Sequence, residues 1–161
     1  MDAGTLLPIL AGIHVVTVLM WIGGVGFVTV VVFPMLLRMD DTLEMVLMFH
    51  RMENRFARHA KVYIWIVGIT GFLMLYLEGR FAGLWSMDNL GILVMIGAWA
   101  FYLLVLTFEK KIFGIVFGKP EEMDGKKVFR MLTGFHWVVL GVSLLAVFLG
   151  VWQGHGGLLS P

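Results

Sequence analysis

Three of the five histidines in this 161-residue chain, His14, His59 and His136, lie within or at the edge of long apolar segments. Ionisable side chains are costly inside a lipid bilayer, so their presence there indicates a function. Imidazole nitrogen is a common ligand for metal ions and for haem iron. The chain has no cysteine, which excludes disulfides and thiolate ligands. Metal chemistry would therefore depend on histidine, methionine or carboxylate side chains.

The segments that must position these histidines are long enough to cross a membrane. Hydrophobic residues make up 60% of the chain and the mean hydropathy is +0.92, whereas soluble domains are roughly 45–50% apolar. A span needs about 20 apolar residues, and four stretches reach that length, at about 6–37, 57–77, 90–108 and 131–152. The sequence predicts an all-α fold, an integral membrane four-helix bundle that forms a single domain over residues 1–161.

The sequence departs in two places from a simple pattern of four regular membrane-spanning helices. The first stretch is longer than a span requires, and we predict that it tilts or bends near Pro34, which lacks a backbone donor. Residues 40–56 alternate apolar and charged side chains at helical spacing. This pattern predicts an amphipathic helix at the inner membrane surface, between the first and second spans.

Basic residues are concentrated around two of the three connecting segments. Five of the twelve lie at or near the first connection and six around the third, which leaves only Arg80 elsewhere. Short loops rich in Lys and Arg stay on the cytoplasmic side. We therefore expect both termini and residues 78–89 on the other side of a bacterial-type inner (cytoplasmic) membrane, crossed several times. The net charge of +1 gives no support for a nucleic-acid partner.

The depth of each histidine follows from the helical rise of 1.5 Å per residue. Measured from the outer ends of their helices, His14 lies about 12 Å down, His59 about 27 Å and His136 about 24 Å. His59 and His136 are therefore predicted to share a level near the inner face, as the two axial ligands of a haem would. The alternative for each is a hydrogen bond to a neighbouring helix or, for His59, contact with the headgroups.

His14 would belong to a second site nearer the outside. Its second ligand stays open, with Met74, Met95 and His155 as candidates, and the alternative for His14 is an interhelical hydrogen bond. His50 lies in the basic surface segment and His155 in the glycine-rich tail, where solvated side chains are expected. Glycines recur within all four spans, and they predict either close helix packing or room for a flat cofactor.

These segments resemble a known family. Residues 13–24 read I-H-V-V-T-V-L-M-W-I-G-G and resemble the first helix of the HemJ-type membrane protoporphyrinogen oxidases and the related CopD-like proteins. Residues 49–74, with F-H-R-M-E-N-R-F and then G-I-T-G-F-L-M, resemble the family's F-x-x-M-E-x-R segment and second span. The run K-V-F-R-M-L at 127–132 resembles the entrance to its fourth span.

The resemblance implies that His14 is a ligand of haem b. A lysine near the start of the third helix is the other ligand implicated in that family, and alignment on Trp85 places Asn89 at its position. An amide cannot replace the lysine amine as a strong iron ligand or as a base. His59 and His136 stand where the oxidase pattern has other residues, so the resemblance implies a different haem arrangement here.

The favoured hypothesis is a b-type cytochrome that holds one or two haem b groups and transfers electrons between quinone and a partner protein. One alternative is a haem-dependent oxidoreductase, the HemJ-type protoporphyrinogen IX oxidase. Another is a CopD-like copper-handling protein, suggested by the 12 methionines because thioethers suit Cu(I). Packing explains most of them, among them Met45, Met48 and Met52. The last alternative is a haem-free structural subunit. Besides the lipid bilayer, the chain could contact further copies of itself or a larger complex.

Overall fold

The computed structural model describes residues 3–86, 89–117 and 124–154. Its elements, in chain order, are α1 (Ala3–Phe27), the π-helical turn η1 (Val28–Val32), α2 (Phe33–Leu36), α3 (Thr42–Leu77), the 3-10 turn η2 (Arg80–Gly83), α4 (Leu90–Phe117) and α5 (Gly125–Gly154). No strand occurs among these described residues. The prediction of an all-α chain is confirmed.

Four helices are long and apolar enough to cross a membrane, over Gly4–Leu36, Thr42–Leu77, Leu90–Lys111 and Gly125–Trp152. Large apolar side chains on their outer faces are exposed, as in Leu19, Trp65 and Val138. Because lipid rather than water would satisfy such faces, the chain is a multi-pass membrane protein. The second and fourth helices begin earlier in the sequence than the predicted spans.

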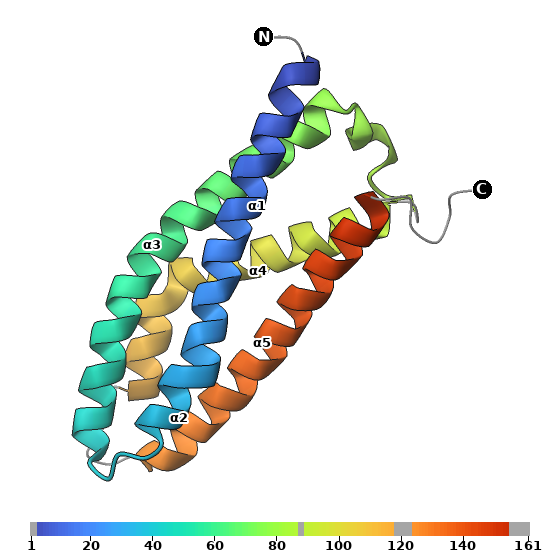
Figure 1. The fold of residues 1–161 in the computed structure, drawn as a ribbon. Coiled ribbons are helices and arrows are strands. Elements are labelled where there is room, and N and C mark those ends of the chain that lie inside the picture. The colour runs from blue at the N-terminus through green and yellow to red at the C-terminus, as the bar shows by residue number, and fades with distance from the viewer. Residues whose placement is uncertain (1–2, 87–88, 118–123, 155–161) are drawn as a thin grey trace.

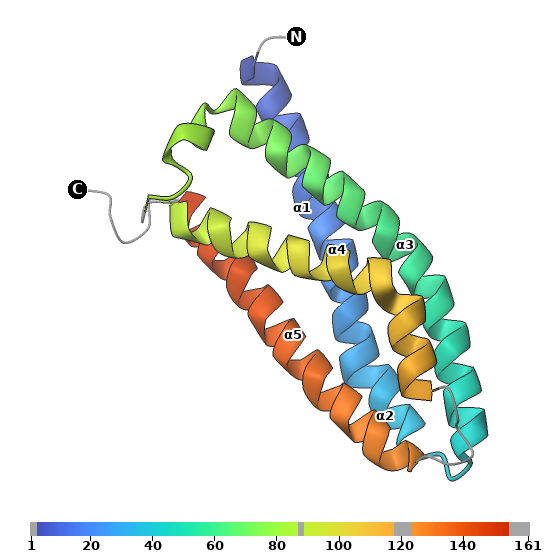
Figure 2. The ribbon, with the colours of Figure 1, turned by 180° about the vertical axis from the view of Figure 1, so that it is seen from behind.

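The bundle consists of two helix pairs. Helix α1 runs beside α3, while α4 starts beside the C-terminal end of α5 and crosses towards α3 (Figures 1 and 2). The pairs diverge at the end that carries Ala3 and η2, which we call the outer end after the predicted orientation. The opposite end, which carries α2 and Asp41, is called the inner end.

Aromatic side chains close the inner end. Phe33 and Phe129 are fully buried, and Phe49 packs against both, with ring centroids 5.7 Å and 5.4 Å away. The Asp41 side chain caps α3 by accepting hydrogen bonds from the backbone N–H of Leu43 (2.7 Å) and Glu44 (3.1 Å), which satisfies donors that the first helical turn leaves free.

The irregularity predicted near Pro34 takes the form of the π turn. The backbone N–H of Phe33 donates to the carbonyl of Val28, five residues earlier, and Pro34 follows at the start of α2. Because proline has no N–H and its ring crowds the carbonyl four residues before it, the helix widens in the preceding turn. The chain then continues helical to Leu36.

The predicted amphipathic segment 40–56 is helical from Thr42 onward, but it is not a separate element. It forms the first half of α3 and continues into the span without a break. Its apolar side chains Met45, Val46 and Phe49 are buried against Phe33 and neighbouring residues. Packing within the bundle therefore accounts for these three residues, whereas Leu43 and Leu47 of the same segment are exposed.

Candidate functional site

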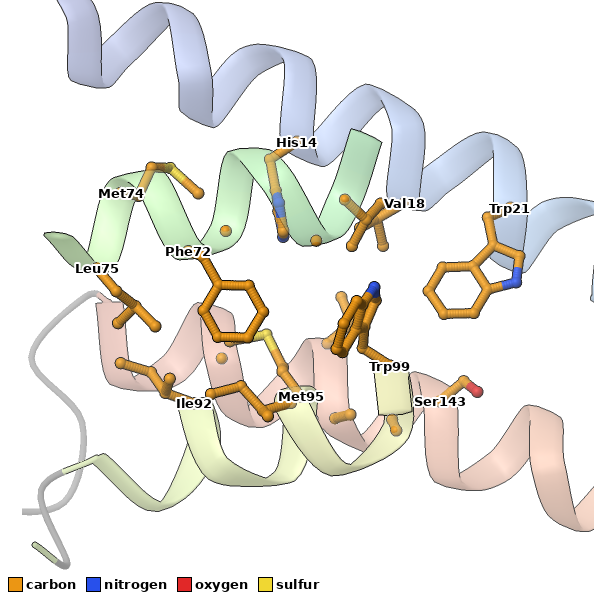
Figure 3. Close-up of a pocket in the computed structure, with 18 of the residues that line it drawn as sticks. His14, Val18, Trp21, Phe72, Met74, Leu75, Ile92, Met95, Trp99 and Ser143 are labelled. Atoms are coloured by element: carbon orange, nitrogen blue, oxygen red, sulfur yellow. The ribbon is translucent and has the colours of Figure 1, made fainter. Parts of the chain in front are cut away.

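A cavity of about 230 Å³ lies between the two helix pairs in the outer half of the bundle. Figure 3 shows α1 and α3 on one side of it and α4 and α5 on the other. Most of its lining is apolar and aromatic, from all four helices and from η2. Its main lining side chains are His14, Val18, Trp21, Phe72, Met74, Leu75, Ile92, Met95, Trp99 and Tyr102.

His14 enters this cavity from α1 with one ring nitrogen already engaged. Its Nδ1 lies 2.9 Å from the hydroxyl oxygen of Thr70 on α3. That hydroxyl donates its own proton to a carbonyl of its helix, with Ile66 O at 2.7 Å. Thr70 can therefore only accept from the histidine, so Nδ1 carries the proton and Nε2 keeps a free lone pair. The backbone of Val67, on the same helix as Thr70, also lies within hydrogen-bonding reach of the ring.

Two glycines of α3 make room for the rings beside them. A Cβ atom at Gly71 would lie 3.2 Å from Cε1 of His14, and one at Gly68 would lie 2.8 Å from the ring of Trp99. The Trp99 indole N–H donates to the carbonyl of Ile64, at 2.9 Å. The close helix packing predicted for the glycines is confirmed at these two positions, and here it serves the cavity.

Two of the candidate second ligands, Met74 and Met95, line the same cavity as His14. Figure 3 shows Met95 projecting from α4, on the side opposite α1. Its sulfur packs on Gly150 of α5, where a Cβ atom would lie only 2.6 Å away. Met74 is on α3, only one helical turn from Thr70. The third candidate, His155, lies outside the described residues.

A hydrogen-bonded pair bounds the cavity on its inner side. The Tyr102 hydroxyl lies 3.0 Å from the Ser143 hydroxyl, which itself donates to the carbonyl of Val139 at 2.7 Å. Tyr102 is therefore the donor to Ser143. The Trp21 ring meets Tyr102 edge-on, with centroids 4.5 Å apart. These contacts fix the aromatic wall without leaving an unpaired hydroxyl.

Charged groups occur at the outer end of the cavity. Glu78 and Arg80 both line it. The Nη2 of Arg80 donates to Asn89 Oδ1 at 2.6 Å, and its Nη1 lies 3.4 Å from Glu78 Oε2. Asn89 is buried and donates to the carbonyl of Gly83 at 2.8 Å. Asn89 thus holds the turn and Arg80, and it is not a lining residue itself.

His136 lies at a second, smaller cavity of about 70 Å³ near the inner end. Its Nδ1 donates to the carbonyl of Leu132, one turn back on its own helix, at 2.9 Å. Its ring packs against Phe33, with centroids 4.7 Å apart. Glu53 and Phe56 of α3 also line this cavity.

His59 is exposed on α3, and its Nδ1 donates to the carbonyl of Arg55 at 2.8 Å. It lines neither of the two cavities. The structure therefore does not bring His59 and His136 to a common cavity, and a haem shared by them stays a prediction. His50 accepts a hydrogen bond from the amide of Asn54 at 2.9 Å, within the charged surface of α3.

Several lining residues were not predicted as members of a site. Trp99 and Tyr102 read as ordinary apolar positions of a span, and no sequence signal separates them from lipid-facing aromatics. Arg80 did carry a signal, because it is the single basic residue away from the two basic connections. Among the described residues, no group of three or more His, Cys, Asp or Glu side chains could hold a metal ion.

Comparison of the chain with family models, with curated proteins and with solved structures finds no match. The resemblance to the HemJ-type and CopD-like proteins therefore stays a prediction.

Proposed function

We propose that the protein is a b-type cytochrome of a membrane, which holds haem b in the cavity beside His14 and takes part in electron transfer. The observation that carries this proposal is the state of His14. Its Nδ1–H is fixed by Thr70 of another helix, so Nε2 is left free at a cavity lined mainly by apolar and aromatic side chains. Histidine ligands of metals are commonly oriented in this way, through a hydrogen bond from their other nitrogen.

The donor set of the cavity fits haem iron. His14 would supply imidazole from α1 and Met95 a thioether from α4, and histidine and methionine together hold haem iron in cytochromes. Met95 is the proposed second ligand because it comes from the helix pair opposite His14. Bound haem would supply one-electron redox chemistry. The chain's own residues would ligate it, exclude water and set its potential, with quinone or a redox protein as the electron partner.

This proposal needs one haem and uses neither His59 nor His136 as a ligand. A second haem at the inner end would require His59 to turn from its exposed face towards another helix. The predicted pair is therefore kept as a separate hypothesis, with its own test below.

The HemJ-type oxidase activity is less well supported than electron transfer. Asn89 has its oxygen and its amide engaged by Arg80 and Gly83, so it offers neither an amine ligand nor a base.

The orientation proposed for the bundle places η2 and both termini on the non-cytoplasmic side of an inner membrane. Its support is the positive-inside distribution of the basic residues.

The test is a spectroscopic measurement on protein purified in mild detergent, together with a pyridine-haemochrome count. We expect about one haem b per chain in the wild type and loss of at least nine-tenths of it in His14→Ala. The matched control is His136→Ala, because His136 has the same tautomer but a different cavity. Wild-type protein without haem, even after reconstitution, would refute the proposal and leave the haem-free structural subunit.

A further inference from the structure

Arg80 is a cation at the outer end of an apolar cavity, on the side of the bundle that otherwise has no basic residue. A guanidinium group there does not contribute to the positive-inside pattern. Its position on η2, between α3 and α4, instead brings it to the point where the two helix pairs diverge. The charge therefore requires an explanation specific to the cavity.

The structure holds this guanidinium in place. Asn89, 7% exposed, accepts from Nη2 at 2.6 Å and is itself anchored to Gly83 O at 2.8 Å and Ser86 Oγ at 3.4 Å. An Arg side chain fixed through one nitrogen has lost much of its rotamer freedom before any ligand binds. Pre-organisation of this kind lowers the entropic cost of binding.

The remaining donors of Arg80 are weakly used. Its contact with Glu78, 3.4 Å between Nη1 and Oε2, is longer than the roughly 2.7–2.9 Å of a strong charge-assisted hydrogen bond. Both side chains are more than a third exposed, so water competes for this contact. A carboxylate that approached from the cavity could form the two parallel hydrogen bonds that guanidinium favours.

We infer that Arg80 recognises the acidic end of the molecule that the cavity holds. The ligand class is then amphipathic, with a flat apolar body between the helix pairs and carboxylate groups at the outer end. This inference rests on the proposed function, for which the acidic groups are the haem propionates. Asn89 acts as a positioning residue for Arg80, and Glu78 competes with the ligand for the guanidinium.

The experiment compares two ligands that differ only at the acidic end. Haem-free protein in detergent is titrated with iron protoporphyrin IX and with its dimethyl ester, and Kd is obtained from the absorption change. The preference of wild-type protein for the acid over the ester is expected to be about tenfold or more, since a bidentate pair with Arg is lost in the ester. Arg80→Gln should reduce that preference to about twofold or less.

Further variants separate recognition from folding. Binding of the ester by Arg80→Gln should equal that of the wild type, which shows that the cavity is intact. Asn89→Leu should lower the preference less than Arg80→Gln does. Glu78→Gln should raise it, because a competing carboxylate has been removed. Arg38→Gln, an exposed arginine at the inner end, is the matched control and should leave the preference unchanged.

Each other outcome overturns the inference. If Arg80→Gln keeps the wild-type preference while both ligands bind through His14, the inference fails and the proposed function stands. If Arg80→Gln weakens acid and ester equally, Arg80 has only a structural role. If neither ligand gives a His14-dependent spectrum in wild-type protein, the proposed function fails, and the inference fails with it.

Discussion

The outer and inner cavities each contain a histidine of the same tautomer, but the surroundings of the two rings differ. His14 donates to a side chain of a neighbouring helix, whereas His136 donates to its own backbone. The outer cavity measures about 230 Å³ and the inner one about 70 Å³. The proposed function favours His14 over His136 because of the space beside its ring and because a second helix fixes that ring.

The neighbours of the two rings differ as well. His14 faces glycine at Gly71, which leaves the imidazole room without contributing a side chain. His136 packs edge-on against the Phe33 ring, which belongs to the buried aromatic cluster of the inner end. The first arrangement leaves a face open to a ligand, and the second uses the imidazole as part of the core.

The largest effect on haem content is expected from a variant that fills the space beside His14. Gly71→Val would place methyl groups where the Cε1 atom of His14 lies, because even a Cβ atom there would be 3.2 Å away. We expect haem content to fall by at least tenfold although His14 is retained. The control is Gly134→Val on α5, where a Cβ atom would meet nothing within 4 Å. Equal haem in both variants would contradict the proposed position of the site.

The next largest effect is expected from Thr70→Val, which removes the acceptor of the His14 N–H. Loss of such an outer-shell partner typically costs about 10–100-fold in affinity, and we expect that range for the haem Kd in titrations. Thr133→Val is the matched control, since Thr133 bonds only the carbonyl of Phe129 in the described structure, at 2.7 Å. A Thr70→Val variant with wild-type affinity would show that His14 is not held for ligation.

A smaller change is expected from Met95→Leu, which keeps the volume of the side chain but removes the thioether. Haem should remain bound through His14, and its midpoint potential should fall, because a Met ligand raises the potential. The shift should be on the order of 0.1 V, within the roughly 0.8 V that axial ligands span. Met74→Leu is the control in a redox titration. If Met74→Leu shifts the potential instead, the second ligand has been misassigned.

The smallest effect is expected from His59→Ala. His59 is exposed and contacts its own helix. Haem content and the absorption spectra of the oxidised and reduced protein should therefore stay within error of the wild type. This variant also tests the predicted inner pair. Loss of one spectral component, shared with His136→Ala, would establish that pair and reduce the contrast between the two ends.

The sequence predicted the membrane spans because each depends only on a run of apolar residues, which local composition determines. It also placed His14 within such a run, where a histidine is costly unless it is used, and the composition of the chain alone gives that position. Met74 and Met95 line the same cavity as His14, and either of them as its second ligand stays a prediction.

Rotation about the helix axis was harder to predict. His59 and Thr70 are 11 residues apart and point in directions within about 20° of each other on an ideal helix, so both side chains lie on the same face of α3. In the structure Thr70 is buried and His59 is exposed. Which part of a face is covered depends on the neighbouring helices at that level. Spans that are apolar all round carry little periodicity to reveal it.

The π turn of the first span has a consequence for how the chain tolerates changes in length. Its wider turn accommodates Val28–Val32 just before Pro34. Each residue of a regular helix adds about 100° of rotation. The π turn contains one residue more than a regular turn, so a one-residue deletion in this turn should convert its five-residue hydrogen bond to the ordinary four-residue one and leave His14 and Phe33 in phase. The first span can therefore lose one residue at Val28–Val32 without rotating the side chains of either cavity, whereas a deletion elsewhere in the span would rotate one end against the other.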